Sequence, residues 1–247
     1  MNSIADSFEE RLHEIDAYLD LLDALQRQAQ SGPPKIGDFV ITAQQQKILY
    51  SSVYLQLYNL VEATATWCVS AVVEATADNS RWTPKDLHAP LLREWLRKTA
   101  RTHVSLNSNN RLNEAVALCE TIFESRPITE WEVEQGGGGN WDDSAIEKIA
   151  ARIGCDLDIS DAVKSAAKRP IRDDKNSLGL VKYLRNRLAH GLLSFEQCGA
   201  GVTVLDLRDI TERTANYLRE VVAAFVDYID NYLFLSPSIR PTTGGVT

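Results

Sequence analysis

The sequence predicts an all-α protein: a bundle of four long helices with an inserted helical segment and a short β-hairpin before the last helix. Three observations support this fold class. Apolar residues recur at three- and four-residue steps along most of the chain, which is the period of an α-helix. Glycines and prolines lie between these stretches, where they end helices. The 247 residues, 44% of them hydrophobic, are enough for one large domain with a buried core.

The first two long helices are expected over residues 4–30 and 43–77. The first is amphipathic, because its apolar side chains recur on one face. They are Ile4, Phe8, Leu12, Ile15, Leu19 and Leu22. The Ser-Gly-Pro-Pro sequence at 31–34 ends this helix. The second helix is apolar around most of its circumference, which indicates burial among other helices.

Residues 79–160 are interpreted as an insertion into the bundle. Shorter helices are predicted here, at about 85–103, 109–124 and 142–153, and loops separate them. The four glycines at 136–139 are interpreted as a flexible connection, because no Lys-Ser/Thr pair follows them as it would in a phosphate-binding loop.

The third long helix is expected over residues 175–190, with Gly191 as its C-terminal cap. The segments 193–195 and 202–207 flank a glycine-containing turn and are predicted to pair as a short hairpin. The last helix is expected over residues 208–235.

The chain is therefore predicted to form a single domain over residues 1–236. A disordered tail is expected over 237–247, where small and polar residues follow a proline.

Composition restricts the classes of function. The formal net charge of −8 argues against general coating of nucleic acids and against binding to an anionic membrane surface. The first ten residues are polar and acidic, unlike a secretory signal, and no apolar run is long enough to span a membrane. The four cysteines lie far apart, which suggests neither a disulfide framework nor a zinc site. We expect a cytoplasmic protein in a reducing compartment.

One segment of this acidic chain is strongly basic. Between residues 163 and 190 there are two acidic residues, Asp173 and Asp174, and eight basic ones. The basic residues are Lys164, Lys168, Arg169, Arg172, Lys175, Lys182, Arg185 and Arg187. A basic patch on an acidic body attracts polyanions locally, and we take Lys182, Lys175 and Arg172 as candidates for RNA contacts. A solvated helix face explains the charge equally well.

The third helix carries the candidate chemistry. At about 100° per residue it turns one apolar stripe toward the core. The stripe consists of Leu178, Val181, Leu184 and Leu188. His190 and Asn186 fall nearly opposite the stripe, and Arg185 lies at its edge. We therefore expect the imidazole to face solvent or a second subunit.

Arg185, Asn186 and His190 suit one reaction, the attack of a ribose 2′-hydroxyl on its own 3′-phosphate. The C-terminal end of a helix favours a protonated imidazole, so His190 would take and give protons. Arg185, with Arg187 as a second candidate, would hold the phosphate and stabilise its developing charge. Asn186 would position the substrate or the histidine. RNA supplies the nucleophile, so we expect neither a metal nor a cofactor.

Two polar residues on the apolar second helix, Asn59 and Glu62, are candidates for supporting roles. Burying an unpaired carboxylate is costly, so Glu62 should have a cationic partner or reach a cleft. We expect that partner to be Arg185, with the carboxylate orienting the guanidinium. A purely structural ion pair explains Glu62 equally well.

These residues resemble the HEPN superfamily, and most of all its MAE-type branch found in bacterial toxin and defence loci. The resemblance includes the Arg185-Asn186-x3-His190 motif and the sequence Leu-Ala-His-Gly at 188–191. It also takes in Tyr-Asn-Leu-Val-Glu-Ala at 58–63 and the stretch at 139–146.

The resemblance implies a four-helix bundle that dimerises so that two Arg/His helices face each other across a cleft. It also implies metal-independent RNA cleavage that leaves a 2′,3′-cyclic phosphate and a 5′-hydroxyl. Arg185 and His190 carry over directly. Such activity is toxic, so a neutralising antitoxin or a defence-system partner is expected. Some members carry a modified tyrosine two residues beyond the histidine, but Leu192 occupies that position here.

Two other functions remain open from the sequence. A non-catalytic member of the same fold would use the basic face to bind nucleotide or RNA, or to assemble with a defence complex. A structural helical adaptor would cleave no RNA and would copurify with a stable partner.

Overall fold

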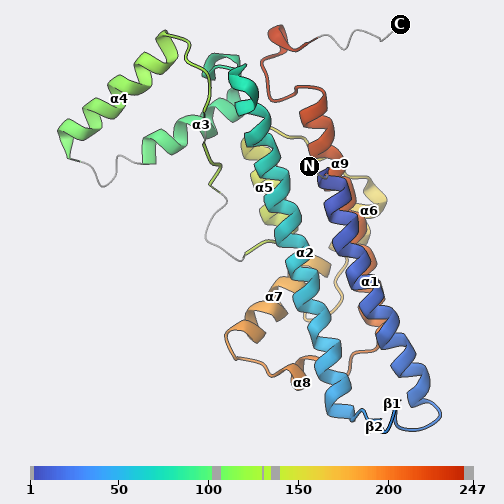
Figure 1. Cartoon of the computed structure of the whole chain (residues 1–247). Helices are drawn as coiled ribbons and strands as arrows, with labels where there is room; N and C mark the ends of the chain where they lie inside the picture. Colours follow the sequence, from blue (N-terminus) through green and yellow to red (C-terminus); the bar gives the residue numbers. More distant parts are fainter. Residues whose placement is uncertain (1–2, 102–106, 130, 135–139, 242–247) are drawn as a thin grey trace, which may run out of the picture. The chain divides into compact units, whose positions relative to one another are not determined.

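The computed structural model of the chain describes residues 3–101, 107–129, 131–134 and 140–241, to which all structural statements below refer (Figure 1). The all-α prediction is confirmed. The helices are α1 (Ile4–Ala29), α2 (Ala43–Ala77), α3 (Ala89–Arg101), α4 (Ser108–Phe123), α5 (Asp143–Ile153), α6 (Asp161–Lys168), α7 (Ser177–Ala189), α8 (Phe195–Cys198) and α9 (Val204–Asp230). Two short strands, β1 (Lys35–Ile36) and β2 (Phe39–Val40), pair antiparallel between α1 and α2. Within the described ranges, no helix has both the length and the apolar character needed to cross a bilayer.

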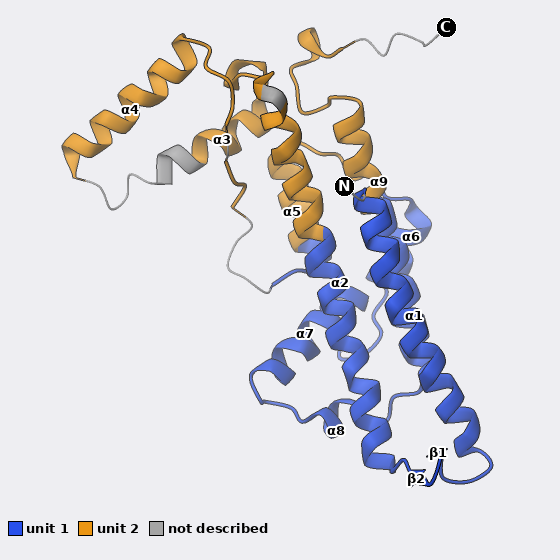
Figure 2. Ribbon diagram, viewed as in Figure 1, with its two compact units in different colours: residues 1–64, 139–144, 159–220 blue, residues 65–138, 145–158, 221–247 orange. Residues whose placement is uncertain are grey.

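The chain divides into two compact units (Figure 2). Unit 1 comprises residues 1–64, 139–144 and 159–220, and unit 2 comprises 65–138, 145–158 and 221–247. Both α2 and α9 contribute residues to the two units. Most of the expected insertion, 79–160, falls in unit 2, but its residues 139–144 and 159–160 belong to unit 1. The glycine run 136–139 lies outside the described residues.

Unit 1 has a core of four helices, α1, α7 and the first parts of α2 and α9, and it also contains α6 and α8. The helices α1 and α2 are antiparallel, because Arg11 bonds to Asn59 whereas Tyr18 donates to the carbonyl of Leu49, 3.0 Å away. Apolar side chains of all four helices form the core. They include Phe8, Leu12, Leu19, Leu22, Val53, Leu57, Leu60, Val61, Leu178, Val181, Leu184, Leu207, Ile210 and Leu218. The predicted amphipathic faces of the first and third long helices are thus confirmed.

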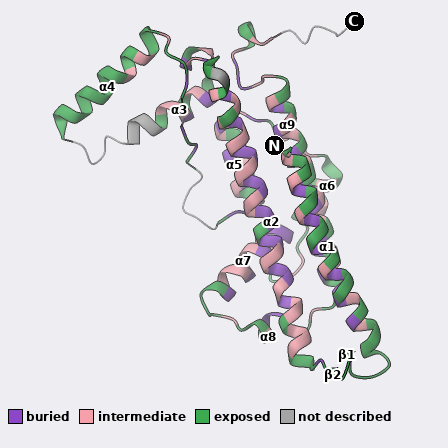
Figure 3. Cartoon of the chain, in the orientation of Figure 1, coloured by how far each residue is buried: buried purple, intermediate pink, exposed green. Residues whose placement is uncertain are grey.

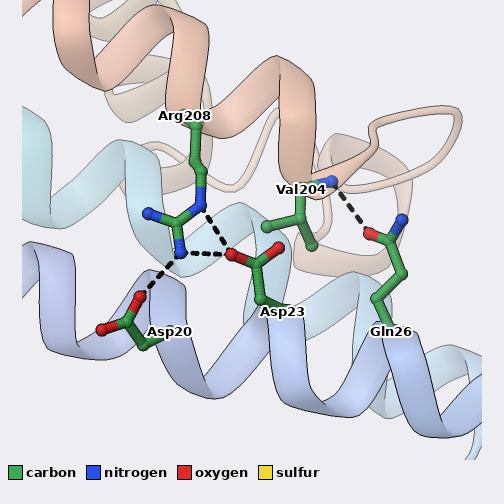
Figure 4. Close-up of polar contacts among 5 residues, drawn as sticks. All are labelled: Asp20, Asp23, Gln26, Val204 and Arg208. Atoms are coloured by element: carbon green, nitrogen blue, oxygen red, sulfur yellow. Dashed lines mark hydrogen bonds and ion pairs between the residues drawn. The ribbon is translucent and has the colours of Figure 1, made fainter.

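Polar contacts join the C-terminal part of α1 to the first turns of α9 (Figure 4). Arg208 bridges two carboxylates of α1, with its Nη2 2.8 Å from Oδ1 of Asp20 and its Nε 2.6 Å from Oδ2 of Asp23. The side chain of Gln26 accepts a hydrogen bond from the N–H of Val204, 3.2 Å away. This bond satisfies a donor at the first residue of α9, which has no partner within the helix.

Unit 2 contains α3, α4 and α5 with the last parts of α2 and α9. Two buried hydrogen bonds tie its segments together. The indole of Trp131 donates to Oγ1 of Thr76 at 2.8 Å, and the hydroxyl of Tyr228 donates to the carbonyl of Ile153 at 2.8 Å. In contrast, α4 has no buried residue, and Figure 3 shows it exposed along most of its length.

The hairpin predicted from 193–195 and 202–207 is wrong, because this region is helical. Ser194 and Gln197 form a reciprocal capping box that starts α8. Thr203 likewise accepts a hydrogen bond from the N–H of Asp206, which starts α9 four residues earlier than expected. These capping interactions outweigh the β propensity of the valine and leucine residues.

Two further differences concern shorter segments. Helix α6, which has eight residues and overlaps the start of the basic segment, was not predicted. The predicted tail from 237 begins with a 3-10 turn, Pro237–Ile239, and Arg240 donates to the carbonyl of Leu233 at 3.2 Å. Residues 242–247 lie outside the described residues.

Candidate active site

Helix α7 presents the predicted Arg/Asn/His motif at its C-terminal end. The helix begins at the N-cap Asn176, whose side chain accepts from the N–H of Gly179. It ends in paired backbone bonds, from Gly191 to the carbonyl of Leu188 and from Leu192 to that of Arg187. Gly191 has φ +67°, the left-handed conformation that such an ending requires. The predicted glycine cap is confirmed, and it fixes where the helix stops beside His190.

Arg185 is held between α7 and α2. Its Nη1 donates to the side-chain oxygen of Asn186 at 2.8 Å, and its Nη2 lies 3.4 Å from Oε2 of Glu62. The guanidinium carbon lies 3.9 Å from the centre of the Tyr58 ring. The expected ion pair between Arg185 and Glu62 is therefore present. The side chains are 24% and 38% exposed, respectively, so both groups remain within reach of a ligand.

Tyr58 and Glu62 occupy the same face of α2, because they are one helical turn apart. Tyr58 is buried, and its hydroxyl accepts a hydrogen bond from the N–H of Trp141 at 3.2 Å. Burial raises the pKa of Tyr58, and this hydrogen bond opposes the shift only in part. The phenol therefore stays neutral at physiological pH and offers Arg185 an aromatic face.

His190 is exposed at the end of the same helix, as the sequence predicts. Its backbone N–H bonds to the carbonyl of Asn186 at 3.0 Å, which places the two residues one turn apart. Among the described residues, no side chain forms a hydrogen bond with its ring. The imidazole is thus available to a substrate, and Asn186 links the position of His190 to that of Arg185.

Lys175 and Arg187 meet on one aromatic ring. The Nζ of Lys175 lies 4.5 Å from the centre of the Tyr183 ring, and the guanidinium carbon of Arg187 lies 5.5 Å from it. Arg187 also donates to the Tyr183 hydroxyl at 3.2 Å and to the carbonyl of Leu192 at 3.3 Å. These contacts hold two cations, one of them just before α7, against a side chain of that helix.

Three other predicted site residues are directed elsewhere. Asn59 is exposed, and its side-chain oxygen accepts from Arg11 of α1 at 2.6 Å, so it does not join Arg185. Lys182 forms an ion pair with Asp142, which neutralises much of its charge. Arg172 lies 4.0 Å from Asp173 in the turn before α7.

Two tyrosines and one segment near the site had no predicted role: Tyr58, Tyr183 and residues 140–144. Tyr58 stands four residues before Glu62, and Tyr183 stands four residues before Arg187. This spacing was a usable signal for both tyrosines, because such residues share a helix face. No local pattern predicts that Trp141 and Asp142, about 35 residues before the start of α7, reach the site.

In the parts of the chain that the structure describes, no group of three or more His, Cys, Asp or Glu side chains is placed to hold a metal ion. Cys68, Cys155 and Cys198 are buried free thiols, and Cys119 is exposed.

Comparison with known proteins identifies one family. The model of the HEPN_MAE_28990-like HEPN family matches residues 1–234. No curated protein and no solved structure gives a significant match to the chain.

Proposed function

Because the chain belongs to the HEPN family, we propose that it is a metal-independent endoribonuclease with Arg185, Asn186 and His190 at its active centre. HEPN domains are often ribonucleases or RNA-binding modules. One observation carries the choice of a ribonuclease. A partly exposed guanidinium, fixed by Asn186 and Glu62, lies on the same helix end as an exposed imidazole.

The proposed reaction needs a proton acceptor, a proton donor and a cation. The ribose 2′-oxygen bonds to the adjacent phosphorus while the bond from phosphorus to the 5′-oxygen breaks. The proton of the 2′-hydroxyl passes to a neutral His190, and the leaving 5′-oxygen takes a proton from an imidazolium. Arg185 stabilises the charge that builds up on the phosphate oxygens. The products are a 2′,3′-cyclic phosphate and a 5′-hydroxyl.

A homodimer would supply two imidazoles to one cleft. One copy of His190 could then accept the proton of the 2′-hydroxyl while the other protonates the leaving oxygen. The residues that follow His190 support such an interface, because Leu192 and Phe195 are large apolar side chains exposed in the single chain. We therefore place the dimer contact at the end of α7 and at α8.

Lys175 and Arg187 are the best-supported RNA contacts outside the catalytic group. Both lie against Tyr183, which restricts their motion and lowers the entropic cost of holding a phosphate. Arg172 would extend this basic surface. Lys182 contributes less, because Asp142 balances its charge.

We further propose that the enzyme acts as a toxin or defence effector. RNA cleavage without restraint harms the cell that makes the enzyme. A neutralising protein or an activating trigger must therefore control it, and a partner protein that covers the end of α7 would block both substrate and dimerisation.

The proposal is tested by incubating RNA with wild type, His190→Ala and Arg185→Ala in the presence of EDTA. Wild type should cleave, and both variants should lose at least about a hundredfold in rate, the lower range for a general acid–base group. His13→Ala is the matched control, because His13 is an exposed histidine on α1. Equal rates for wild type and His190→Ala, or cleavage only with added metal, would refute the mechanism.

A non-catalytic RNA-binding module is the second candidate. The Lys175–Tyr183–Arg187 group favours it, because this surface can bind RNA without His190. In that case His190→Ala would bind RNA as wild type does, while a charge reversal at Arg187 would abolish binding, and neither protein would cleave.

A further inference from the structure

We infer that Tyr58 is a positioning residue of the candidate active site, whose ring holds the guanidinium of Arg185 in the orientation that the reaction needs. The inference rests on the proposed ribonuclease function and deepens it. Tyr58 does not touch the substrate in this account. It acts through Arg185, which lies 3.9 Å from its ring centre.

The ring is well placed to set the guanidinium plane. Arg185 has hydrogen-bonding partners at two nitrogens, Asn186 at 2.8 Å and Glu62 at 3.4 Å. These hydrogen bonds set the direction in which the guanidinium points. Each partner side chain, however, is itself partly exposed and can rotate. A buried aromatic face beneath the guanidinium adds a further constraint on its plane, because a cation over a ring is most stable near its centre.

Tyr58 is itself fixed by a second contact. Its hydroxyl accepts from the N–H of Trp141, and the next residue, Asp142, pairs with Lys182 of α7. Asp143 then accepts from the side chain of Asn176 at 3.0 Å. Three consecutive residues therefore attach the segment 140–144 to both helices of the site. This attachment keeps the phenol ring from turning away from Arg185.

Arg185 contacts both Glu62 and Tyr58 of α2. Of these two contacts, the one with the Tyr58 ring is the stronger, and we expect it to determine the orientation of the guanidinium. An ion pair between partly exposed groups is weak, because water screens it. The contact of a cation with a buried ring is more stabilising, because one side of the contact is already desolvated. Loss of the ring should therefore disturb Arg185 more than loss of the Glu62 charge.

The test compares variants of the full-length protein at a single temperature below all their melting temperatures. Tyr58→Leu removes the ring, and we expect kcat for RNA cleavage to fall about tenfold while KM changes little. Tyr58→Phe keeps the ring and loses only the hydroxyl, so its kcat should stay within about threefold of wild type. Tyr54→Leu is the matched control, because Tyr54 lies one turn earlier on α2 and is buried to a similar degree, 3% exposed against 2% for Tyr58.

A further variant separates electrostatics from packing. Pentafluorophenylalanine in place of Tyr58 keeps a ring of similar shape but removes the negative potential of its face. We expect its kcat to fall below that of Tyr58→Phe, with the same melting temperature. If Tyr58→Leu does not fold, this comparison still tests whether the ring of Tyr58 positions Arg185.

The outcomes separate the two proposals. If wild type cleaves RNA and the fluorinated protein matches Tyr58→Phe in kcat, the ring is a packing element and the inference is overturned. Equal kcat values for Tyr58→Leu and Tyr54→Leu would overturn it as well. A wild type that cleaves no RNA overturns the proposed function, and this inference falls with it.

Discussion

Arg185 of α7 and Glu62 of α2 form an ion pair whose atoms Nη2 and Oε2 are 3.4 Å apart. The two residues are 123 positions apart in the sequence, and yet chemistry predicted their contact, since a carboxylate on an apolar helix needs a cation. Asn186 holds the other end of the guanidinium. Glu62 therefore belongs to the surroundings of the candidate active site.

Glu62→Gln should affect catalysis more than stability. Since both partners are partly exposed, we expect the free energy of unfolding to change by less than about 1 kcal/mol. The rate of RNA cleavage should fall several-fold, because the amide orients Arg185 less firmly. Denaturant unfolding and initial rates measure the two effects. A large loss of stability with an unchanged rate would mean that the pair is structural.

Leu192→Asp tests the proposed dimer contact. The side chain is 65% exposed in the single chain, so the substitution should change the stability of the fold by no more than about 0.5 kcal/mol. At the interface, however, it would bury a charge without a partner. We expect light scattering to report a monomer and RNA cleavage to be lost. Leu205→Asp, at a site that is 72% exposed, is the control. A stable Leu192→Asp dimer would place the contact elsewhere.

Lys175→Gln tests the proposed RNA contact beside α7. Removing one phosphate contact should weaken RNA binding several-fold and reduce the slope of log affinity against log salt by about 0.7, the value for a single strand. Lys148→Gln on α5 is the control, because Lys148 is an exposed lysine of unit 2. Titrations at several salt concentrations measure both quantities. An unchanged slope for Lys175→Gln would remove Lys175 from the binding surface.

The stability of unit 2 should depend on pH through His88. Burial lowers the pKa of His88, although its hydrogen bond to the carbonyl of Ile153 opposes the shift. The unfolded chain therefore takes up the proton more readily than the folded one. The stabilisation is fully present above the unfolded pKa of about 6.5 and is lost as the pH falls through the lower, folded pKa. We expect His88→Gln to flatten the decline in unfolding free energy between pH 7 and pH 5. Equal slopes in wild type and variant would contradict this assignment.

The long helices could be predicted from the sequence because their signal is local and repeated. The apolar positions of α1 and the stripe of α7 recur with helical period, and α2 has the predicted bounds, Ala43–Ala77. The prediction failed for the segment between α7 and α9, because capping interactions start helices there. Ser194 with Gln197, and Thr203 with Asp206, start helices where β-branched and apolar residues suggested strands.

The contacts of the candidate site could be predicted for a charged group that needs a partner of opposite charge. Glu62 needed a cation, and the exposure of His190 followed from its position opposite the leucine stripe. The contacts of Asn59 and Lys182 were not predictable, because their partners Arg11 and Asp142 lie far away in the sequence. Only the packing of the chain decides which of many carboxylates or guanidinium groups arrives next to a given side chain.

The chemical nature of the RNA ends tests the central claim most directly. RNA of defined sequence is treated with wild type in EDTA, and the fragments are analysed by mass spectrometry. The account predicts 2′,3′-cyclic phosphates and 5′-hydroxyls from wild type, and intact RNA after the same treatment with His190→Ala. Fragments with 5′-phosphates and 3′-hydroxyls, or the same fragments from the His190→Ala protein, would contradict it.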